Sequence, residues 1–186
     1  MKRNFDIVLA ILLLIILSLP MLIISVLIKL SSQGPVLFWS KRVGKDNKLF
    51  RMPKFRTMRQ DTPLVATHLL DDTINYRTVV GSFLRLSSLD EIPQLYSIIR
   101  GHMSFVGPRP ALFNQKNLIT LRTEKGVHKL VPGLTGLAQI SGRDDLPIIE
   151  KVELDYQYLC NQTFWYDIKI FTLTAIKVVK REGVSH

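Results

Sequence analysis

The stretch RLSSLDEIPQL, residues 85–95, places Asp90 and Glu91 side by side in a largely apolar run. Neighbouring helical residues point about 100° apart, so the two acids cannot face one atom as a symmetric pair. An ionised Asp90 is a competent nucleophile toward phosphorus, and Mg²⁺ would help two anions approach each other. There is also a structural explanation: Ser88 and Glu91 match a capping box, or Asp90 is the N-cap, which suits Pro93 in a first turn. Either way a helix N-terminus, where phosphate binds favourably, is expected here.

Five basic residues could hold phosphate oxygens near such a nucleophile. Arg109 stands between two prolines and Arg143 follows Gly142, so both belong to predicted turns. Guanidinium groups match the geometry of a phosphoryl group. The candidate phosphate-binding residues are Lys54, Arg56, Arg85, Arg109 and Arg143. A solvated surface charge is the simpler explanation for any one of them, and their joint placement in rigid turns is what favours a site.

The charge balance points to an anionic partner. Lys and Arg total 25 against 15 Asp and Glu, a formal net charge of +10. Nucleic acid, anionic lipid and a phosphorylated substrate all fit this charge. The single cysteine excludes an internal disulfide, and the four histidines have no spacing typical of a metal site. The sequence contains no base-reading motif, which disfavours nucleic acid.

A charge-free apolar run covers residues 7–28. As a straight helix it would reach roughly 33 Å, enough to cross a hydrocarbon core of about 30 Å. A cleaved signal peptide has an apolar region of about 7 to 15 residues and a small-residue cleavage site, so this run does not fit one. Basic residues flank the run at residues 2–3 and again from Lys29. Positive charge at both ends is typical of two cytoplasmic ends.

A re-entrant hairpin would keep both ends of this run on one side of a membrane. Pro20 cannot donate a backbone hydrogen bond and its ring crowds the carbonyl of Ile16, while Ser18 can bond a nearby carbonyl. Ser18 and Pro20 are therefore the predicted break, with two arms of about a dozen residues each. Proline also occurs in helices that cross a membrane, so the residues alone leave both topologies open.

The rest of the chain predicts an α+β fold that is mostly helical. Residues 31–50 favour a strand or short hairpin, and residues 67–70 a short helix. Further helices are expected over residues 78–86 and from the acidic pair to Arg100, where Gly101 would end the helix in a left-handed conformation.

The C-terminal segment predicts a basic amphipathic helix. Its apolar stripe consists of Phe164, Ile168, Phe171, Ala175, Val178 and Val179. Lys169 and Lys177 lie away from the stripe, and Trp165 and Tyr166 stand near its start. This pattern suits a helix that lies in the membrane interface. A helix packed on the protein core is the alternative.

Several long motifs occur in one order: PKFRTM, FLRLSSLDEIPQL, GHMSFVGPRPAL, PGLTGLAQISGRDD and KREGVSH. With them the chain resembles, over nearly its whole length, the bacterial sugar transferase family, the monotopic phosphoglycosyl transferases. The resemblance implies transfer of a sugar 1-phosphate from a UDP-sugar to polyprenyl phosphate, undecaprenyl phosphate in most bacteria, with release of UMP. Such a reaction is the first membrane step in the assembly of a capsule, O-antigen, exopolysaccharide or glycoprotein glycan.

The resemblance also assigns roles to residues. It implies that Asp90 forms a covalent phosphosugar intermediate, that Glu91 assists, and that Mg²⁺ is held by this pair. It implies a re-entrant anchor over residues 1–30 and a catalytic domain over 31–186 on the cytoplasmic face of the bacterial inner membrane, with amphipathic interfacial helices. TPLVATHLL and ALFNQ resemble members that use UDP-N-acetylamino sugars, in some cases 6-deoxy sugars. Inner-membrane lipid and downstream glycosyltransferases are the implied partners.

Two other functions are compatible with the residues. A membrane-tethered basic module would bind anionic lipid or nucleic acid without chemistry, and its binding would weaken with salt whatever the state of Asp90. A Mg²⁺-dependent phosphohydrolase would use the same acids with water as the acceptor.

Overall fold

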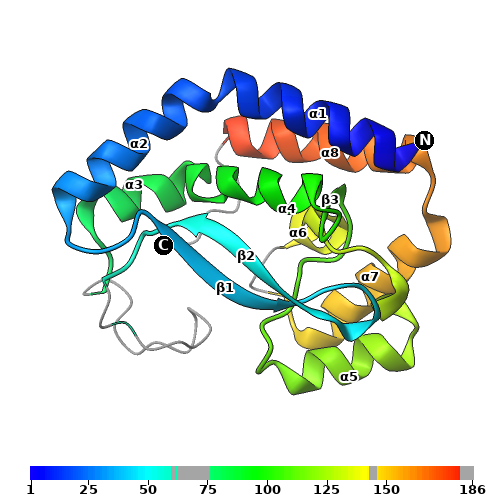
Figure 1. Cartoon of the computed structure of the whole chain (residues 1–186). Helices are drawn as coiled ribbons and strands as arrows, with labels where there is room; N and C mark the ends of the chain where they lie inside the picture. The colour runs from blue at the N-terminus through cyan, green and yellow to red at the C-terminus, as the bar shows by residue number, and fades with distance from the viewer. Residues whose placement is uncertain (60–61, 63–75, 143–145, 181–186) are drawn as a thin grey trace.

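The computed structural model describes residues 1–59, 62, 76–142 and 146–180, and it omits the side chains of residues 178–180. Within these residues the fold is α+β and mostly helical, as expected, with two small sheets. The helices are α1 (Lys2–Ile16), α2 (Ser18–Ser31), α3 (Val79–Leu86), α4 (Leu95–Ile99), α5 (Lys116–Glu124), α6 (Leu137–Ser141), α7 (Ile148–Asn161) and α8 (Phe164–Lys180). In Figure 1, α1 and α2 arch over the other elements and α8 runs beside α1. The helix expected over residues 67–70 lies outside the described residues.

The sheets are both two-stranded. Strands β1 (Leu37–Val43) and β2 (Leu49–Phe55) form an antiparallel hairpin, which confirms the hairpin expected from residues 31–50. The short turn η1 (Lys45–Asn47) joins them. Strands β3 (Ser104–Val106) and β4 (Gly133–Thr135) pair in parallel.

The apolar N-terminal run folds into two helices that meet at Leu17 with a bend of 60°. Ser18 Oγ donates a hydrogen bond to the Ile15 carbonyl at 2.8 Å. Pro20 lies in the first turn of α2 and has no N–H to offer the preceding turn. The bend therefore occurs beside Ser18 and Pro20, the two residues predicted to break the run.

No single helix among the described residues is both long enough and apolar enough to cross a membrane. Taken together as a bent pair, α1 and α2 have the required length and apolar composition. Both helices expose large apolar side chains. The exposed ones are Val8, Ile11, Leu12, Ile15, Ile16, Leu19, Leu22, Ile23, Val26, Leu27 and Leu30. A continuous apolar face of this kind marks a surface that contacts a membrane or another protein.

The opposite face of α1 is fixed to the rest of the protein by charged residues. Lys2 Nζ lies 2.5 Å from Asp167 Oδ2 of α8 and donates to the Val106 carbonyl of β3 at 2.9 Å. Tyr158 donates its hydroxyl to Asp167 Oδ1 at 2.5 Å, and burial together with this hydrogen bond raises the pKa of Tyr158. Asp6 accepts a hydrogen bond from the Phe105 amide. Residues that flank the apolar run therefore also join α1 to the core.

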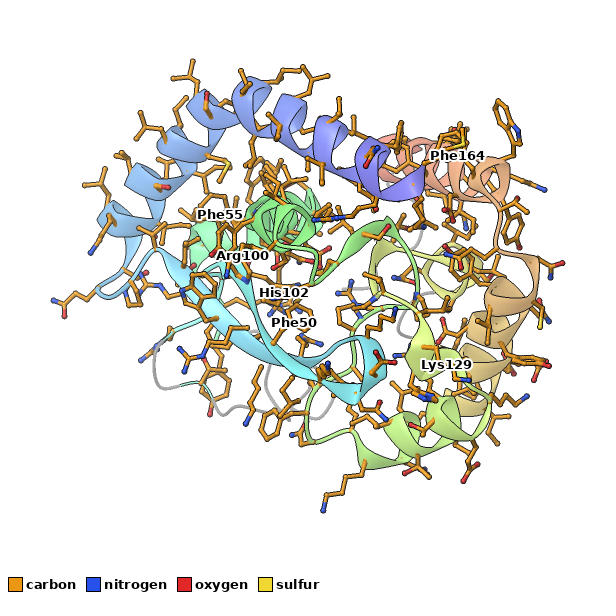
Figure 2. All side chains as sticks on the ribbon, turned by 45° about the vertical axis from the view of Figure 1, so that its right-hand side comes forward. Phe50, Phe55, Arg100, His102, Lys129 and Phe164 are labelled. Atoms are coloured by element: carbon orange, nitrogen blue, oxygen red, sulfur yellow. The ribbon has the colours of Figure 1, made fainter. Side chains whose placement is uncertain are left out.

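Arg3 closes the C-terminal end of α4. Its guanidinium donates to the carbonyls of Ile98 and Ile99, the latter at 2.7 Å. The last carbonyls of a helix have no partner within the helix, so a cation placed there satisfies them and complements the helix dipole. Gly101 follows in the left-handed conformation, at φ 81°, as predicted. Figure 2 shows His102, the residue after Gly101, close to Phe50 of β2, and the centroids of their two rings are 5.6 Å apart.

Helix α3 begins at the predicted position. Thr78 is its N-cap, and Thr78 Oγ1 accepts from the Gly81 amide at 2.9 Å. Gly81 packs directly on the backbone of Thr57, where an added Cβ would lie 2.0 Å from the Thr57 carbonyl oxygen. This close contact brings the end of β2 against α3, next to the acidic stretch.

Helix α8 packs on the protein through part of its predicted stripe. Phe171 contacts Phe105 of β3 at a ring distance of 5.6 Å, and Phe164 contacts Phe5 of α1 at 5.5 Å. Figure 2 shows Phe164 near the start of α1. Phe164 and Phe171 of the predicted apolar stripe therefore pack on the rest of the protein, as the core-packed interpretation of this helix predicted. Exposed apolar side chains of α8 lie on another face, at Trp165, Leu173 and Ile176.

Candidate active site

The acidic pair lies in a 3₁₀ turn rather than at an α-helix N-cap. This turn, η3, spans Leu89–Gln94, and Ser88 precedes it in a left-handed conformation at φ 56°. The Ser88 side chain makes no capping bond; its carbonyl accepts from the Glu91 amide at 3.2 Å. The capping box is therefore wrong, and so is Asp90 as N-cap, because Asp90 lies inside the turn. The tight turn still directs the two acids differently.

Glu91 is held by two cations. Lys54 Nζ lies 2.7 Å from Glu91 Oε1, and Arg109 Nη2 lies 3.1 Å from the same oxygen. Burial alone would raise the pKa of Glu91, but Lys54 and Arg109 together hold this pKa well below its ordinary value. Glu91 is therefore a fixed anion that orients a lysine from β2 and an arginine from the loop after β3.

Asp90 is buried, with 7% of the residue exposed, and is less firmly paired. Lys54 Nζ lies 3.8 Å from Asp90 Oδ2, beyond hydrogen-bond distance. Burial raises the pKa of Asp90 above its ordinary value, against the opposing effect of Lys54. A carboxylate that is poorly solvated and only loosely paired keeps a lone pair available for attack. The two adjacent acids thus have different environments and suit different tasks.

Arg85 lies at the edge of this cluster. Its Nε donates to Thr57 Oγ1 at 2.9 Å, which fixes the guanidinium. Burial lowers the pKa of Arg85, and the nearby charge of Asp90 opposes that change. Arg85 therefore contributes positive potential at Asp90.

Arg56 occupies a different place. Its guanidinium donates to the carbonyls of Gln33 and Ser32, the latter at 2.8 Å, in the segment between α2 and β1. Arg56 thus binds backbone in the linker after the N-terminal helices, so the structure does not bring it to the acidic pair. Arg143 lies outside the described residues. Of the five candidate phosphate ligands, Lys54 and Arg109 contact the acidic pair and Arg85 borders it.

The loop that carries Arg109 is held by two further arginines, which the sequence reasoning missed. Arg122 Nη1 donates to the Arg109 carbonyl at 2.8 Å, and Arg42 Nη1 donates to the Pro110 carbonyl at 3.1 Å. The Val43 amide also donates to the Ala111 carbonyl at 2.9 Å. Successive carbonyls of one loop are thus bound from β1 and from α5. This arrangement fixes the loop backbone from which the Arg109 side chain extends.

Arg122 is itself fixed by a buried carboxylate. Its Nε and Nη2 lie 2.9 Å and 2.6 Å from Asp155 Oδ2 of α7. Burial raises the pKa of Asp155, and Arg122 opposes that rise. Residues 122 and 155 lie in different helices with no shared motif, so no local sequence pattern could have paired them.

The residues offer an incomplete set of metal ligands. Among the described residues no group of three or more His, Cys, Asp or Glu side chains could hold a metal ion. Mg²⁺ is commonly bound by one or two carboxylates together with substrate phosphates and water. Asp90 fits that shared kind of site, whereas Glu91 already binds Lys54 and Arg109.

The cluster has the parts needed for phosphoryl transfer. A buried carboxylate stands beside an ammonium and a guanidinium whose orientation is set by a second carboxylate. Both cations can donate hydrogen bonds to phosphate oxygens, and a guanidinium can do so with two parallel N–H groups. Phosphoryl transfer depends mainly on positioning and charge stabilisation of this kind.

Comparison with known proteins agrees with this chemistry. The UDP-glucose:undecaprenyl-phosphate glucose-1-phosphate transferase of Escherichia coli K12 is 41% identical over 185 residues, 95% of this chain and 40% of that protein. The undecaprenyl-phosphate galactose phosphotransferase of Salmonella typhimurium is 37% identical over 199 residues, 98% of this chain and 41% of that protein. The chain thus spans about two fifths of the length of these two relatives.

A shorter relative matches end to end. The uncharacterized sugar transferase EpsL of Bacillus subtilis is 39% identical over 185 residues, which cover 100% of this chain and 90% of that protein. The family model for bacterial sugar transferases matches residues 1–181, which include the acidic pair and both cations that bind Glu91. This chain therefore belongs to the bacterial sugar transferase family.

Proposed function

We propose that the protein transfers a sugar 1-phosphate from a UDP-sugar to polyprenyl phosphate, undecaprenyl phosphate in most bacteria, and releases UMP. The observation that carries the proposal is a buried carboxylate, Asp90, beside two cations that Glu91 fixes, in a chain of this family. The glucose-1-phosphate transferase of Escherichia coli and the galactose phosphotransferase of Salmonella typhimurium are both named for the same lipid carrier, undecaprenyl phosphate. Membership of a transferase family favours this enzyme over a basic module that only binds lipid or nucleic acid.

The first half of the reaction makes a covalent intermediate. An oxygen of Asp90 attacks the phosphorus that carries the sugar, and the bond from that phosphorus to the bridging oxygen of UMP breaks. UMP leaves with the bond's electron pair, and the sugar phosphate stays on Asp90 as a mixed anhydride. Lys54 and Arg109 lie where they can stabilise the oxygens that gain charge.

The second half regenerates the enzyme. A phosphate oxygen of the polyprenyl phosphate attacks the same phosphorus, and the bond between phosphorus and the Asp90 oxygen breaks. The product is polyprenyl diphosphate sugar, and Asp90 returns as a carboxylate. Glu91 keeps the two cations in place through both halves, because its low pKa leaves it ionised.

Mg²⁺ is proposed as the cofactor. Asp90 and the phosphates of the donor would hold it, and Glu91 could become a ligand if one of its cations moved to the substrate. A bound Mg²⁺ would neutralise part of the charge that opposes approach of a carboxylate to a diphosphate.

The sugar is proposed to be an N-acetylated amino sugar, with a 6-deoxy form as an option. The relatives named for glucose and for galactose are 41% and 37% identical to this chain, so overall identity does not decide which sugar it uses.

A panel of UDP-sugars tests the reaction and the sugar together. One UDP-sugar should yield UMP before any lipid is added, in an amount equal to the amount of enzyme. No UMP from any UDP-sugar, with or without polyprenyl phosphate, would contradict the proposed function.

The bent pair of α1 and α2 is proposed as a re-entrant anchor in the bacterial inner membrane. Their exposed apolar face would lie in lipid, and the catalytic residues would lie on the cytoplasmic side. The bend of 60° at Leu17, the ion pair of Lys2 with Asp167 before the first arm, and the hydrogen bond from Arg56 to the Ser32 carbonyl just after the second arm support a segment whose two ends stay on one face. A glycosyltransferase acting on the lipid-linked product is the proposed downstream partner.

Cysteine labelling tests this topology. In a Cys160→Ser background, Asn4→Cys and Gln33→Cys place one thiol at each end of the bent pair, both at exposed positions. A membrane-impermeant maleimide is expected to label both thiols only in inside-out vesicles. Labelling of the two thiols from opposite sides would contradict the re-entrant anchor and indicate a crossing helix.

A further inference from the structure

Thr57 lies where the end of β2 meets α3, and its backbone is fixed by two contacts. The residue is buried, with 7% exposed. Its carbonyl accepts from the amide of Thr78, the N-cap of α3, at 3.1 Å. An added Cβ at Gly81 would lie 2.6 Å from the Thr57 Cα, so a side chain at residue 81 would push the two backbones apart. In Figure 1 the end of β2 lies near α3.

Arg85 lies one turn after Gly81, on the same face of α3. Its Nε donates to Thr57 Oγ1 at 2.9 Å, and its Nη2 donates to Met58 Sδ at 3.4 Å. Nε and Nη2 form one edge of the planar guanidinium. Two consecutive residues after β2 therefore hold this edge, which sets the direction of the other edge.

The other edge of Arg85, which carries Nη1, is available to a ligand. Nη1 makes no hydrogen bond within the described part of the chain. Asp90 acts on the pKa of Arg85 more strongly than any other charged group does, so the guanidinium lies near the nucleophile. Two parallel N–H groups of a guanidinium edge match two oxygens of a phosphoryl group.

A hydroxyl group orients Arg85, whereas a carboxylate orients the two other cations of the site. Lys54 and Arg109 both bind Glu91, which neutralises part of their charge. Thr57 carries no charge, so it fixes the guanidinium and leaves the positive charge of Arg85 undiminished. An arginine held in this way can stabilise negative charge on a substrate.

Resting on the proposed transferase function, we propose that Thr57 is a positioning residue for the transfer reaction. Its hydroxyl holds one edge of the Arg85 guanidinium so that the other edge binds oxygens of the phosphoryl group that Asp90 attacks. Thr57 itself touches no substrate atom. A guanidinium aligned with the charge of the transition state lowers the barrier, so a misaligned one slows the reaction more than it weakens substrate binding.

Thr57→Val tests this role because it keeps the shape of the side chain and removes the hydroxyl. Rapid-quench measurement of a single turnover should show UMP release with a rate constant lowered by about tenfold or more, since small errors in alignment are costly. The amplitude of the UMP burst should stay at the wild-type value. Thr57→Ser restores the hydroxyl, and its rate constant should lie within about threefold of the wild-type value.

Two further variants control for stability and for the route of the effect. Thr174→Val removes a hydroxyl of α8 that lies 2.7 Å from Thr135 Oγ1, and it should leave the rate constant unchanged. In an Arg85→Lys background, Thr57→Val should lower the remaining rate constant by less than about threefold, because lysine has no guanidinium edge to align. The full loss in that background would show that Thr57 acts through another residue.

The remaining outcomes separate Thr57 from the reaction itself. A wild-type rate constant in Thr57→Val would overturn the positioning role, and so would a lower burst amplitude at an unchanged rate constant, because fewer folded molecules would explain it. A wild-type protein that releases no UMP from any UDP-sugar would contradict the transferase function instead. Calorimetric binding of inorganic pyrophosphate would then decide the role of Thr57. Weaker binding by Thr57→Val than by Thr174→Val would support it, and equal binding would overturn it.

Discussion

Replacing Asp90 with Asn is expected to abolish both the stoichiometric release of UMP and the turnover with polyprenyl phosphate. The substitution keeps the shape of the side chain, and its neutral amide cannot form the phosphosugar intermediate. Loss of a covalent nucleophile lowers the rate by about a thousandfold or more. Rapid-quench measurement of UMP from a single turnover of the UDP-sugar checks the first half-reaction alone.

The control makes the same chemical change at an exposed acid. Asp46 lies in the β1–β2 turn at φ 54°, a conformation that Asn adopts readily, so Asp46→Asn should keep full activity. Full turnover by Asp90→Asn would contradict the assignment of Asp90 as the nucleophile.

The pH profile of the wild-type enzyme gives a second check on Asp90. Because burial raises the pKa of Asp90 and attack needs its ionised form, the wild-type rate should fall with acidification at a pH above the ordinary range of an aspartate.

Local rules predicted the elements around the site better than the site itself. The helix over residues 78–86 and the left-handed Gly101 follow from short-range chemistry, and both are confirmed. The capping box failed because Ser88 turned out to be left-handed and the acids lie in a 3₁₀ turn. The environment of Glu91 depends on Lys54, which is 37 residues away in sequence. Lys54 and Arg109 lower the pKa of Glu91, burial by the surrounding fold raises the pKa of Asp90, and no local sequence pattern records either effect.

The roles of the basic residues likewise depend on long-range contacts that the local sequence does not show. A positive charge in a sequence predicts an anionic partner, yet many partners here are carbonyl groups of the protein. Arg3, Arg56 and Arg122 all bind backbone carbonyls, which positions α4, the linker after α2 and the Arg109 loop. Composition therefore predicts an anionic partner, but it cannot tell a residue that binds one from a residue that positions the backbone.

Replacing Arg122 with Met is expected to destabilise the protein by about 3–5 kcal/mol, because it leaves the carboxylate of Asp155 buried and uncompensated. Arg122 and Asp155 have side chains that are 12% and 1% exposed, so water cannot replace the lost partner. The double variant Arg122→Met/Asp155→Leu should recover most of this stability, since it removes both charges. Thermal denaturation of the variants in the same detergent measures their stability. Lys125→Met, which removes one partner of the exposed Lys125–Glu153 ion pair, is the control, and its stability should change little.

The pH dependence of the single variant has a definite sign. Burial already raises the pKa of Asp155 in the folded protein, and loss of Arg122 raises it further. A carboxyl group with a raised folded pKa destabilises the fold only when it is ionised. The part of the Arg122→Met deficit that comes from this charge should therefore be full above the raised pKa, and it should shrink as the pH falls below that pKa towards the pKa of Asp155 in the wild-type protein. A deficit that grows on acidification would contradict the buried, unpaired carboxylate.

Activity measurements distinguish two roles of Arg122, which are to compensate the charge of Asp155 and to hold the loop that carries Arg109. The double variant regains stability but still lacks the hydrogen bond to the Arg109 carbonyl, so the Arg109 loop is less firmly held. Its KM for the UDP-sugar is expected to stay raised by about tenfold, the value of one lost hydrogen bond to a charged group, at wild-type stability. A double variant with wild-type KM would show that Arg122 only balances Asp155. A raised KM in a fully folded protein would make Arg122 the residue that positions Arg109 for the phosphates of the donor.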